Sequence, residues 1–147
     1  MANPDTTLLK KFMANPSTPL KIDSNPLAEA LDARFLAADE KGTVRLDFEP
    51  GDAFLQGNNA VQGGAVAAML DFAMAFAALA ALPDDQGGAT TSMTVNYLKA
   101  VKPGRYEASA GLDRKGRTLI FASAELRAEN GDLVATGTSV LAVVQVG

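Results

Sequence analysis

Residues 57–82 read GNNAVQGGAVAAMLDFAMAFAALAAL, and this stretch decides the fold of the chain. After a polar loop, every residue of 65–82 except Asp71 is apolar. Because Ala, Met and Leu favour helix, we predict a helix over residues 65–82 that ends before Pro83. A helix that is apolar on every side is buried on every side, so the rest of the chain is expected to wrap around it.

Asp71 is the one charged side chain within this predicted helix. An unpaired buried carboxylate is costly, so Asp71 needs hydrogen-bond partners or access to water. Two interpretations follow from the residue alone. Asp71 is either a functional carboxylate or a core acid whose hydrogen bonds are satisfied.

The composition excludes several classes of chemistry. The 147 residues are 48% hydrophobic and carry a net charge of −4, which fits one globular domain and does not fit a nucleic-acid-binding protein. The chain has no Cys and no His. Disulfides, thiolate nucleophiles, His-ligated metals and His-based triads are therefore excluded, and acid–base chemistry falls to carboxylates, Tyr or Lys.

The sequence predicts a cytoplasmic protein without a membrane partner. Its N-terminus, MANPDTTLLKKFMANP, lacks the continuous apolar run of a signal peptide. The apolar stretch 65–82 is just long enough to span a membrane. It is rich in Ala, carries Asp71 near its centre and has no Lys or Arg close to either end, so we interpret it as a core helix.

Local patterns predict the other elements. Asn3-Pro4-Asp5 resembles a helix start, and a short amphipathic helix ends at Asn15-Pro16. A linker over residues 17–22 and a short helical turn over 27–31 follow. Alternating apolar residues and turn signals then predict strands at 33–39, 43–49, 90–99, 104–114, 117–129 and 133–146.

This order predicts an α+β fold, in which a curved antiparallel sheet of about six strands wraps one long apolar helix. The tight connections between the last four strands predict that they are neighbours in chain order. Several strands, such as LIFASAEL, are apolar on both faces, which indicates that the outer face of the sheet packs against a second subunit.

From about residue 32 to residue 146, this layout resembles the hotdog fold and, within it, the PaaI-like acyl-CoA thioesterases. The motif of that family reads in outline Asn-x-x-Gly-x-x-His-Gly-Gly, followed by an apolar helix with Asp or Glu nine residues after the His. Gly63-Gly64 and Asp71 stand at the matching positions. The resemblance implies a single hotdog domain over residues 1–147, with an N-terminal helical segment at 1–30 and the hotdog core at 31–147.

The chain departs from this motif at two positions, because Gln62 replaces the family His and Asn59 replaces the middle Gly. Gln56 stands six residues before Gln62, at a position that is often Asn or Gln in the family. Gln62 cannot take up a proton, but its amide can donate a hydrogen bond to a thioester oxygen. The resemblance makes Gln62 and Gln56 polar positioning residues and Asn59 part of the substrate-binding loop.

Thioester hydrolysis needs a site for the carbonyl oxygen and an activated nucleophile. The backbone N–H of Gly63 or Gly64, at the start of a helix, has no partner within the helix and can serve as an oxyanion donor. Asp71 is then the general base for water or the nucleophile itself. Eight residues of helix separate Gly63 from Asp71 by ~12 Å, so a site that uses both takes them from two subunits. We therefore expect a homodimer or a dimer of such dimers.

Further substrate contacts are expected from three regions. The resemblance aligns Thr90 with a hydroxyl that helps to position water. Met69, Phe72 and Met74 are expected to shape an acyl pocket along the helix, with small Ala residues leaving room. A basic cluster in the predicted turn between residues 114 and 117 could bind CoA phosphates; it comprises Arg114, Lys115 and Arg117. We expect no metal or other cofactor, since CoA is part of the substrate.

Three other functions remain open from the sequence. A non-hydrolytic acyl-CoA or aromatic-ligand binder on the same fold would account for Gln62 in place of His. A hotdog dehydratase or hydratase typically uses a His, which this chain lacks. A purely structural protein would hold Asp71 as a satisfied core acid.

Overall fold

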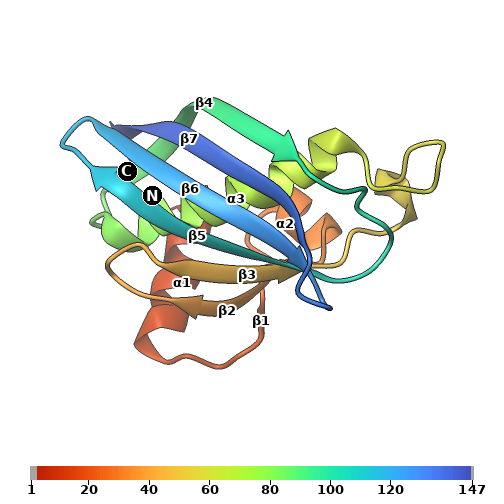
Figure 1. Ribbon diagram of the computed structural model, residues 1–147. Coiled ribbons are helices and arrows are strands. Elements are labelled where there is room, and N and C mark those ends of the chain that lie inside the picture. The colour runs from red at the N-terminus through yellow and green to blue at the C-terminus, as the bar shows by residue number, and fades with distance from the viewer. Residues whose placement is uncertain (1–2, 147) are drawn as a thin grey trace.

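A computed structural model describes residues 3–146. Helices and strands are mixed in the first half of the chain, and the strands of the second half follow one another after the long helix (Figure 1). The elements, in order, are α1 Pro4–Ala14, β1 Leu20–Lys21, α2 Pro26–Ala30, β2 Arg34–Ala38, β3 Val44–Phe48, the short 3₁₀ turn η1 Asp52–Phe54, α3 Gly63–Ala81, β4 Gln86–Tyr97, β5 Tyr106–Lys115, β6 Leu119–Ala128 and β7 Leu133–Gln145.

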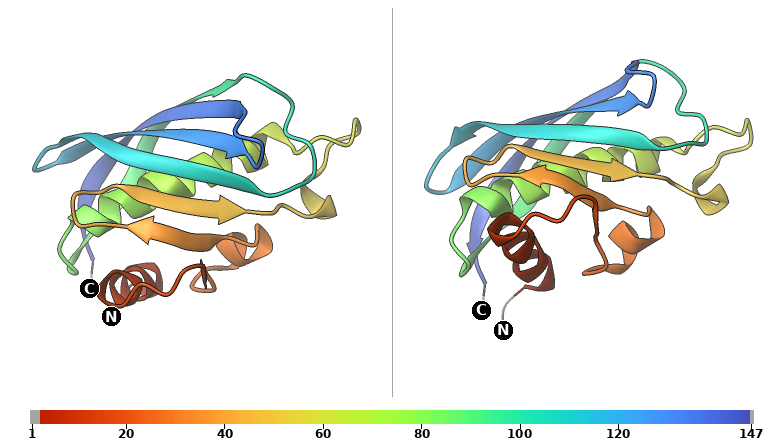
Figure 2. Two further views of the ribbon diagram at one scale, coloured as in Figure 1. Left: turned by 60° about the horizontal axis from the view of Figure 1, so that its bottom comes forward. Right: turned by 90° about the horizontal axis from the view of Figure 1, so that it is seen from below.

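All the strands join in one antiparallel sheet in the order β1-β2-β3-β5-β6-β7-β4. The sheet curves around α3, which lies along its concave face (Figures 1 and 2). This arrangement confirms the predicted hotdog fold. It has seven strands in place of about six, because Leu20–Lys21, within the predicted linker, pairs with β2 as a short edge strand.

Tight packing between α3 and the sheet forms the core. Met69, Leu70, Met74 and Phe76 of α3 are fully or almost fully buried. A side-chain carbon at Gly137 of β7 would lie only 3.3 Å from the Met74 methyl group, so only glycine lets the helix approach the sheet this closely. By length and hydropathy alone α3 could cross a membrane, but 56% of its most apolar window is buried in this fold, as in a core helix.

The prediction that α3 is buried on every side is wrong for a single chain. Its residues Gly64, Ala67, Ala68, Asp71, Phe72 and Ala75 are partly or fully exposed. They recur every three or four residues and therefore share one side of the helix, which we call the open face of α3. The sheet covers one side of α3. The open face, on the other side of the helix, stays uncovered in a single chain.

We predicted that the last four strands pair in chain order, and this prediction is wrong for β4. This strand pairs with β7 along its whole length and forms one edge of the sheet, whereas β5 pairs with β3. The connection over residues 98–105 crosses the end of the sheet. β4 also begins four residues earlier than predicted, because Gln86, Gly87 and Gly88 pair with the last residues of β7.

The N-terminal segment is tied firmly to the core. Helix α1 starts at Asn3-Pro4 as predicted. Asn3 and Asn25 cap α1 and α2 by accepting hydrogen bonds from Asp5 N and Ala28 N at 2.8 Å. The Asp5 carboxylate accepts hydrogen bonds from Ser24 and Asn25 and so links the two helices. α2 is thereby fixed beside the start of α3 (Figure 2).

Candidate functional site

The first turn of α3 presents free backbone donors. Gln62 is the N-cap residue, and its carbonyl oxygen accepts hydrogen bonds from Ala65 N at 2.9 Å and Val66 N at 3.1 Å. Within residues 3–146, the N–H groups of Gly63 and Gly64 have no acceptor. These two donors lie at the positive end of the helix dipole, where they can stabilise a developing negative charge.

The loop before α3 holds this turn in place. Gln62 N donates to the Phe54 carbonyl oxygen at 2.7 Å, and Val61 N donates to the Val101 carbonyl oxygen at 2.7 Å. Gln56 and Asn59 form a tight turn, in which Asn59 N donates to Gln56 O at 3.0 Å. The loop is therefore closed on itself and anchored at both ends.

The geometry of this loop explains one departure from the family motif. Asn59 has a φ of +59°, in the left-handed region that Gly adopts freely and Asn adopts more readily than most residues. Asn59 therefore occupies a backbone conformation in which Gly is also favourable. The Gln56 side-chain oxygen accepts a hydrogen bond from Asn58 N, so this part of the side chain supports the loop. The Gln62 side chain is exposed and makes no capping bond.

Asp71 lies on the open face of α3 and is partly exposed. The Thr90 hydroxyl, on β4, donates to Asp71 Oδ1 at 2.8 Å. The structure thus brings together two residues that the sequence places nineteen positions apart, and it fixes the orientation of the carboxylate. Among residues 3–146 no donor bonds to Asp71 Oδ2, and the side chain contacts solvent, as a fully buried structural acid does not.

Asp71 and Gly63 do not meet within one chain. They lie on the same straight helix, eight residues or ~12 Å apart along its axis. The edge strand β4 lies beside the open face of α3 and has unpaired backbone groups on its outer side.

Tyr97 is a site residue that we did not expect from the sequence. Its hydroxyl donates to the Gly63 carbonyl oxygen at 2.7 Å and so connects the end of β4 to the first turn of α3. The only sequence signal was its place in the alternation Met93, Val95, Tyr97 along the predicted strand. Nothing local indicates that this strand ends against the start of a helix.

Two pockets flank the loop before α3. One, of about 330 Å³, is lined by Gly63, by the polar residues Gln56, Tyr97 and Lys99, and by apolar residues, namely Ala60, Val61, Val66, Leu98, Ala100 and Val101. Lys99 Nζ also lies 3.1 Å from the Asp132 carboxylate, and this hydrogen bond holds the pKa of that carboxyl below its usual range. The other pocket, of about 510 Å³, is mainly apolar and lies between α2, η1 and α3.

The three residues expected to shape an acyl pocket lie in different places. Met69 and Met74 are fully buried in the core, where Met74 Sδ accepts a hydrogen bond from the Ser139 hydroxyl at 3.3 Å. Phe72 is partly exposed on the open face of α3 and stacks with Phe48 and Phe76. Of these three residues, only Phe72 therefore reaches solvent in a single chain.

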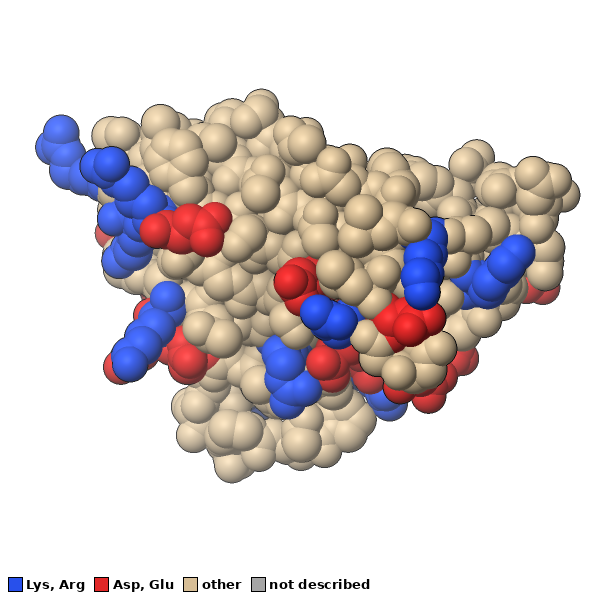
Figure 3. Space-filling view, viewed as in Figure 1, with Lys and Arg blue, Asp and Glu red and all other residues tan. Residues whose placement is uncertain are grey.

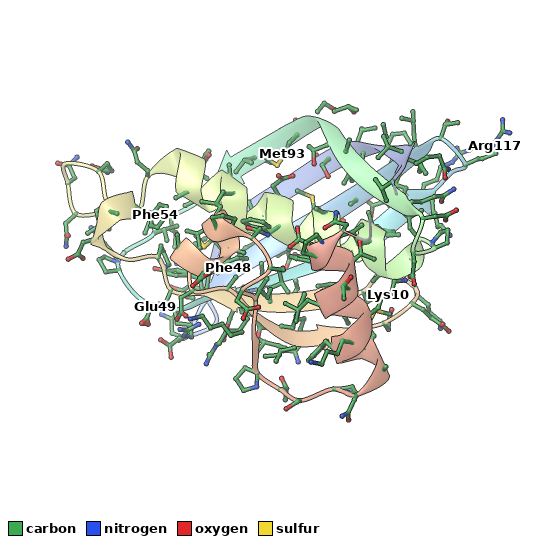
Figure 4. The ribbon with its side chains drawn as sticks, turned by 180° about the vertical axis from the view of Figure 1, so that it is seen from behind. Lys10, Phe48, Glu49, Phe54, Met93 and Arg117 are labelled. Atoms are coloured by element: carbon green, nitrogen blue, oxygen red, sulfur yellow. The ribbon has the colours of Figure 1, made fainter. Side chains whose placement is uncertain are left out.

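The basic cluster lies far from the start of α3. Arg114, Lys115 and Arg117 are exposed at the β5–β6 hairpin. Figure 3 shows blue side chains gathered at the end of the molecule where this hairpin lies. Arg117 and Phe54, which precedes the loop before α3, lie at opposite ends in Figure 4. Within one chain, the structure does not bring this cluster to Gly63.

Comparisons with solved structures agree with this fold. A phenylacetic acid degradation-related protein of Ralstonia eutropha JMP134 is 29% identical, with a TM-score of 0.79 over 91% of this chain and 98% of that one. A thioesterase of Haemophilus influenzae is 20% identical, with a TM-score of 0.76 over 83% of this chain and 85% of that one. A Streptococcus mutans UA159 protein, solved with bound acetyl-CoA, is 19% identical, with a TM-score of 0.72 over 89% of this chain and 98% of that one.

No curated protein sequence matches this chain. The family model of the thioesterase superfamily matches residues 58–135, which include most of the loop before α3, the whole of α3, β4, β5 and β6, and the start of β7. This match covers more than half of the 147 residues. The chain belongs to the thioesterase superfamily.

Proposed function

We propose that this protein hydrolyses acyl-CoA thioesters to a free acid and CoA, at sites shared between the two subunits of a homodimer. One observation carries the proposal. A single partly exposed carboxylate, Asp71, lies on the open face of an otherwise apolar helix, and that helix begins with two free N–H groups. Superfamily membership gives this combination its chemical meaning.

The proposed reaction uses the Gly63 N–H and the Asp71 carboxylate. The thioester oxygen accepts a hydrogen bond from the Gly63 N–H and becomes an oxyanion as the nucleophile adds to the carbonyl carbon. Asp71 either removes a proton from the attacking water or attacks the carbonyl itself to form an anhydride that water then cleaves. In both routes the C–S bond breaks and CoA leaves as its thiol, taking up a proton that the attacking water gives up. In the first route water supplies the new oxygen of the acid. In the second route Asp71 supplies that oxygen, and water, which attacks the Asp71 carbonyl of the anhydride, replaces it. A single turnover in ¹⁸O-labelled water would label the Asp71 carboxylate only in the second route.

The dimer follows from the distance between these groups and from the exposed surfaces. Gly63 and Asp71 of one chain are too far apart to act on one carbonyl, so we pair Gly63 of one subunit with Asp71 of the other. An unpaired edge strand next to an uncovered apolar helix face is the kind of surface that a second copy can cover. Whether two such dimers associate further stays open.

Free-thiol release tests the function. The wild-type protein is mixed with acetyl-, butanoyl-, octanoyl- and succinyl-CoA, and its mass is measured by light scattering under the same conditions. We expect turnover of at least one ester by a dimeric protein. A protein that is monomeric and fully active would contradict the shared site.

The replacement of the family His by Gln62 favours a second candidate, a protein that binds acyl-CoA without hydrolysing it. Gln62 is exposed beside the free N–H groups, and its amide can hold a carbonyl oxygen but cannot transfer a proton. This candidate predicts measurable affinity for the esters and no thiol release. In that case Gln62→His is the variant expected to release thiol.

Removing the Thr90 hydroxyl should slow hydrolysis. Thr90→Val loses the hydrogen bond that orients Asp71, and a bond to a charged group is worth about 1.5–3 kcal/mol, so we expect roughly a tenfold to hundredfold lower kcat. Thr90→Ser keeps the hydroxyl and should keep most of the rate. The matched control is Thr91→Val, which removes a hydroxyl that donates to Val140 O at 3.0 Å. Equal rates for the two Val variants would contradict a role for Thr90.

Removing the Tyr97 hydroxyl should affect both stability and rate. Tyr97→Phe loses the bond to the Gly63 carbonyl, which should lower the free energy of unfolding in urea by about 1 kcal/mol and lower kcat severalfold as the first turn of α3 loosens. Tyr106→Phe is a close control, because the Tyr106 hydroxyl also donates to a backbone carbonyl, Lys102 O, at 2.7 Å. It should lose similar stability at unchanged kcat. A Tyr97→Phe enzyme with wild-type kcat would show that Tyr97 is not a positioning residue.

A further inference from the structure

The apolar pocket between α2, η1 and α3, which we call the α2 groove, adjoins the proposed oxyanion donors. Its volume of about 510 Å³ falls within the ~300–1,000 Å³ typical of small-molecule sites. Six apolar residues line it, namely Leu27, Leu31, Ala53, Phe54, Ala65 and Ala68. Gln62 and Gly64 complete the lining, so the groove reaches the first turn of α3. Figure 4 shows Phe54 and α2 beside the N-terminal half of this helix.

One wall of the α2 groove, α2 itself, is anchored in the core. Leu31 and Ala28 anchor α2 in the core with no exposed surface, and Asn25 caps its first turn. Half of the lining residues precede residue 58, where the match to the thioesterase superfamily begins. Membership of the superfamily therefore does not determine the shape of this groove or what it accepts.

The lining of the α2 groove selects one kind of occupant. Within residues 3–146 of one chain, no Lys, Arg, Asp or Glu side chain lines the groove, and Leu27 keeps 46% of its surface exposed. An uncharged hydrocarbon chain gains about 0.8 kcal/mol for each methylene that it buries, whereas a carboxylate would lose its hydration without gaining a partner. The pocket on the other side of the loop contains Gln56, Tyr97 and Lys99 and suits the polar part of a ligand better.

We propose that the α2 groove binds the hydrocarbon chain of the acyl group, which makes the enzyme selective for saturated acyl chains longer than butanoyl and against acyl groups that end in a carboxylate. This inference rests on the proposed thioester hydrolysis. Gly63 lines the other pocket and the next residue, Gly64, lines the groove, so an ester whose carbonyl oxygen lies at the Gly63 N–H can extend its acyl chain past Gly64 into the groove. Leu27 on α2 is then a specificity-determining residue.

Chain-length selectivity tests this proposal. We expect kcat/KM to rise from acetyl- to octanoyl-CoA by more than about a hundredfold, given ~0.8 kcal/mol per buried methylene, and succinyl-CoA to be a poorer substrate than butanoyl-CoA. Leu27→Gln should lower the octanoyl-to-acetyl ratio by about tenfold, since it makes one wall of the groove polar. Because Leu27 is nearly half exposed, this variant should fold normally, and a thermal melt checks that it does.

Leu119→Gln is the matched control, because Leu119 is 41% exposed and belongs to β6, outside the groove lining. It should leave the octanoyl-to-acetyl ratio unchanged. Hydrolysis with no dependence on chain length, or equal ratios in the two Gln variants, would overturn the acyl groove while leaving the proposed function intact.

A binding measurement decides the case in which no ester is hydrolysed. The non-hydrolysable thioethers S-octyl-CoA and S-ethyl-CoA are titrated calorimetrically into the wild-type protein and into Leu27→Gln. Binding of the octyl compound that is at least tenfold tighter, and that weakens in Leu27→Gln, would support the groove although the hydrolytic function had failed. Equal affinity for the two thioethers would overturn the groove.

Discussion

Asp71→Asn is expected to lower kcat for acyl-CoA hydrolysis by at least about a thousandfold, within the 10²–10⁴ range that general acid–base catalysis contributes. Asn can neither remove a proton from water nor attack the thioester. Its side-chain oxygen can still accept the hydrogen bond from Thr90, and the residue is only partly buried, so the fold and the dimer should persist. Thiol release and light scattering on the same sample measure both properties.

The chain offers a close control for this substitution. Asp113 is exposed, and its Oδ1 accepts a hydrogen bond from the Ser123 hydroxyl of the neighbouring strand at 3.0 Å, much as Asp71 accepts one from Thr90. Asp113→Asn also replaces a carboxylate that accepts a hydrogen bond from a hydroxyl group, but it does so on a strand and not on α3. This variant should leave kcat unchanged. An Asp71→Asn protein with more than a tenth of the wild-type rate would exclude Asp71 as base or nucleophile.

Gly63→Pro is expected to lower kcat by about 10²–10³, the usual loss when one oxyanion donor is removed. Pro has no N–H, and it is favoured at the first position of a helix, which Gly63 occupies. The preceding residue, Gln62, has φ −53° and ψ 140°, the extended conformation that a residue before Pro requires. The helix should therefore start normally, without the donor.

Gly63→Ala isolates the contribution of the N–H. A side-chain carbon at this position lies 3.3 Å from the Tyr97 hydroxyl oxygen, and Ala and Pro both introduce it. Ala keeps the N–H and should lose far less activity than Pro. If thiol release is equally fast in the two variants, the backbone donor of Gly63 takes no part in the reaction.

Local sequence patterns were sufficient to predict where most helices and strands lie in the chain. Asn3 forms the capping hydrogen bond typical of the predicted helix start at Asn3-Pro4-Asp5, and β6 and β7 lie within the strands predicted at 117–129 and 133–146. The apolar run of residues 65–82 identified the central helix to within two residues at its start and one at its end. These signals depend only on neighbours in the chain, so a single sequence contains them.

Contacts between segments that are distant in the chain could not be predicted from such local patterns. The early start of β4 depends on the last residues of β7, and the place of Tyr97 depends on where β4 meets α3. The difference in exposure between the buried Met69 and the partly exposed Phe72 on α3 also depends on contacts with distant segments. In a helix that is apolar on all sides, no periodicity marks the open face, and the sheet alone decides which side remains uncovered.

The α2 groove shows why selectivity was harder to predict than the fold. The expected acyl pocket was placed along α3, because the sequence of that helix was the strongest signal. Leu27 and Phe54 lie in segments whose own patterns indicate only a short helical turn and a loop. They approach Gly64 and Ala68 because α2 and η1 both pack beside the start of α3, which no local pattern indicates.

Complementation between inactive subunits tests the shared site most directly. Asp71→Asn and Gly63→Pro are co-expressed with different affinity tags, and dimers that carry both tags are purified in two steps. In such a dimer one site combines an intact Gly63 with an intact Asp71, and the other site has neither. The heterodimer should release thiol at about half of the wild-type rate, since a two-fold symmetric dimer has two equivalent sites, while each homodimer stays nearly inactive. A heterodimer as inactive as its parents would contradict a thioesterase site built from both subunits.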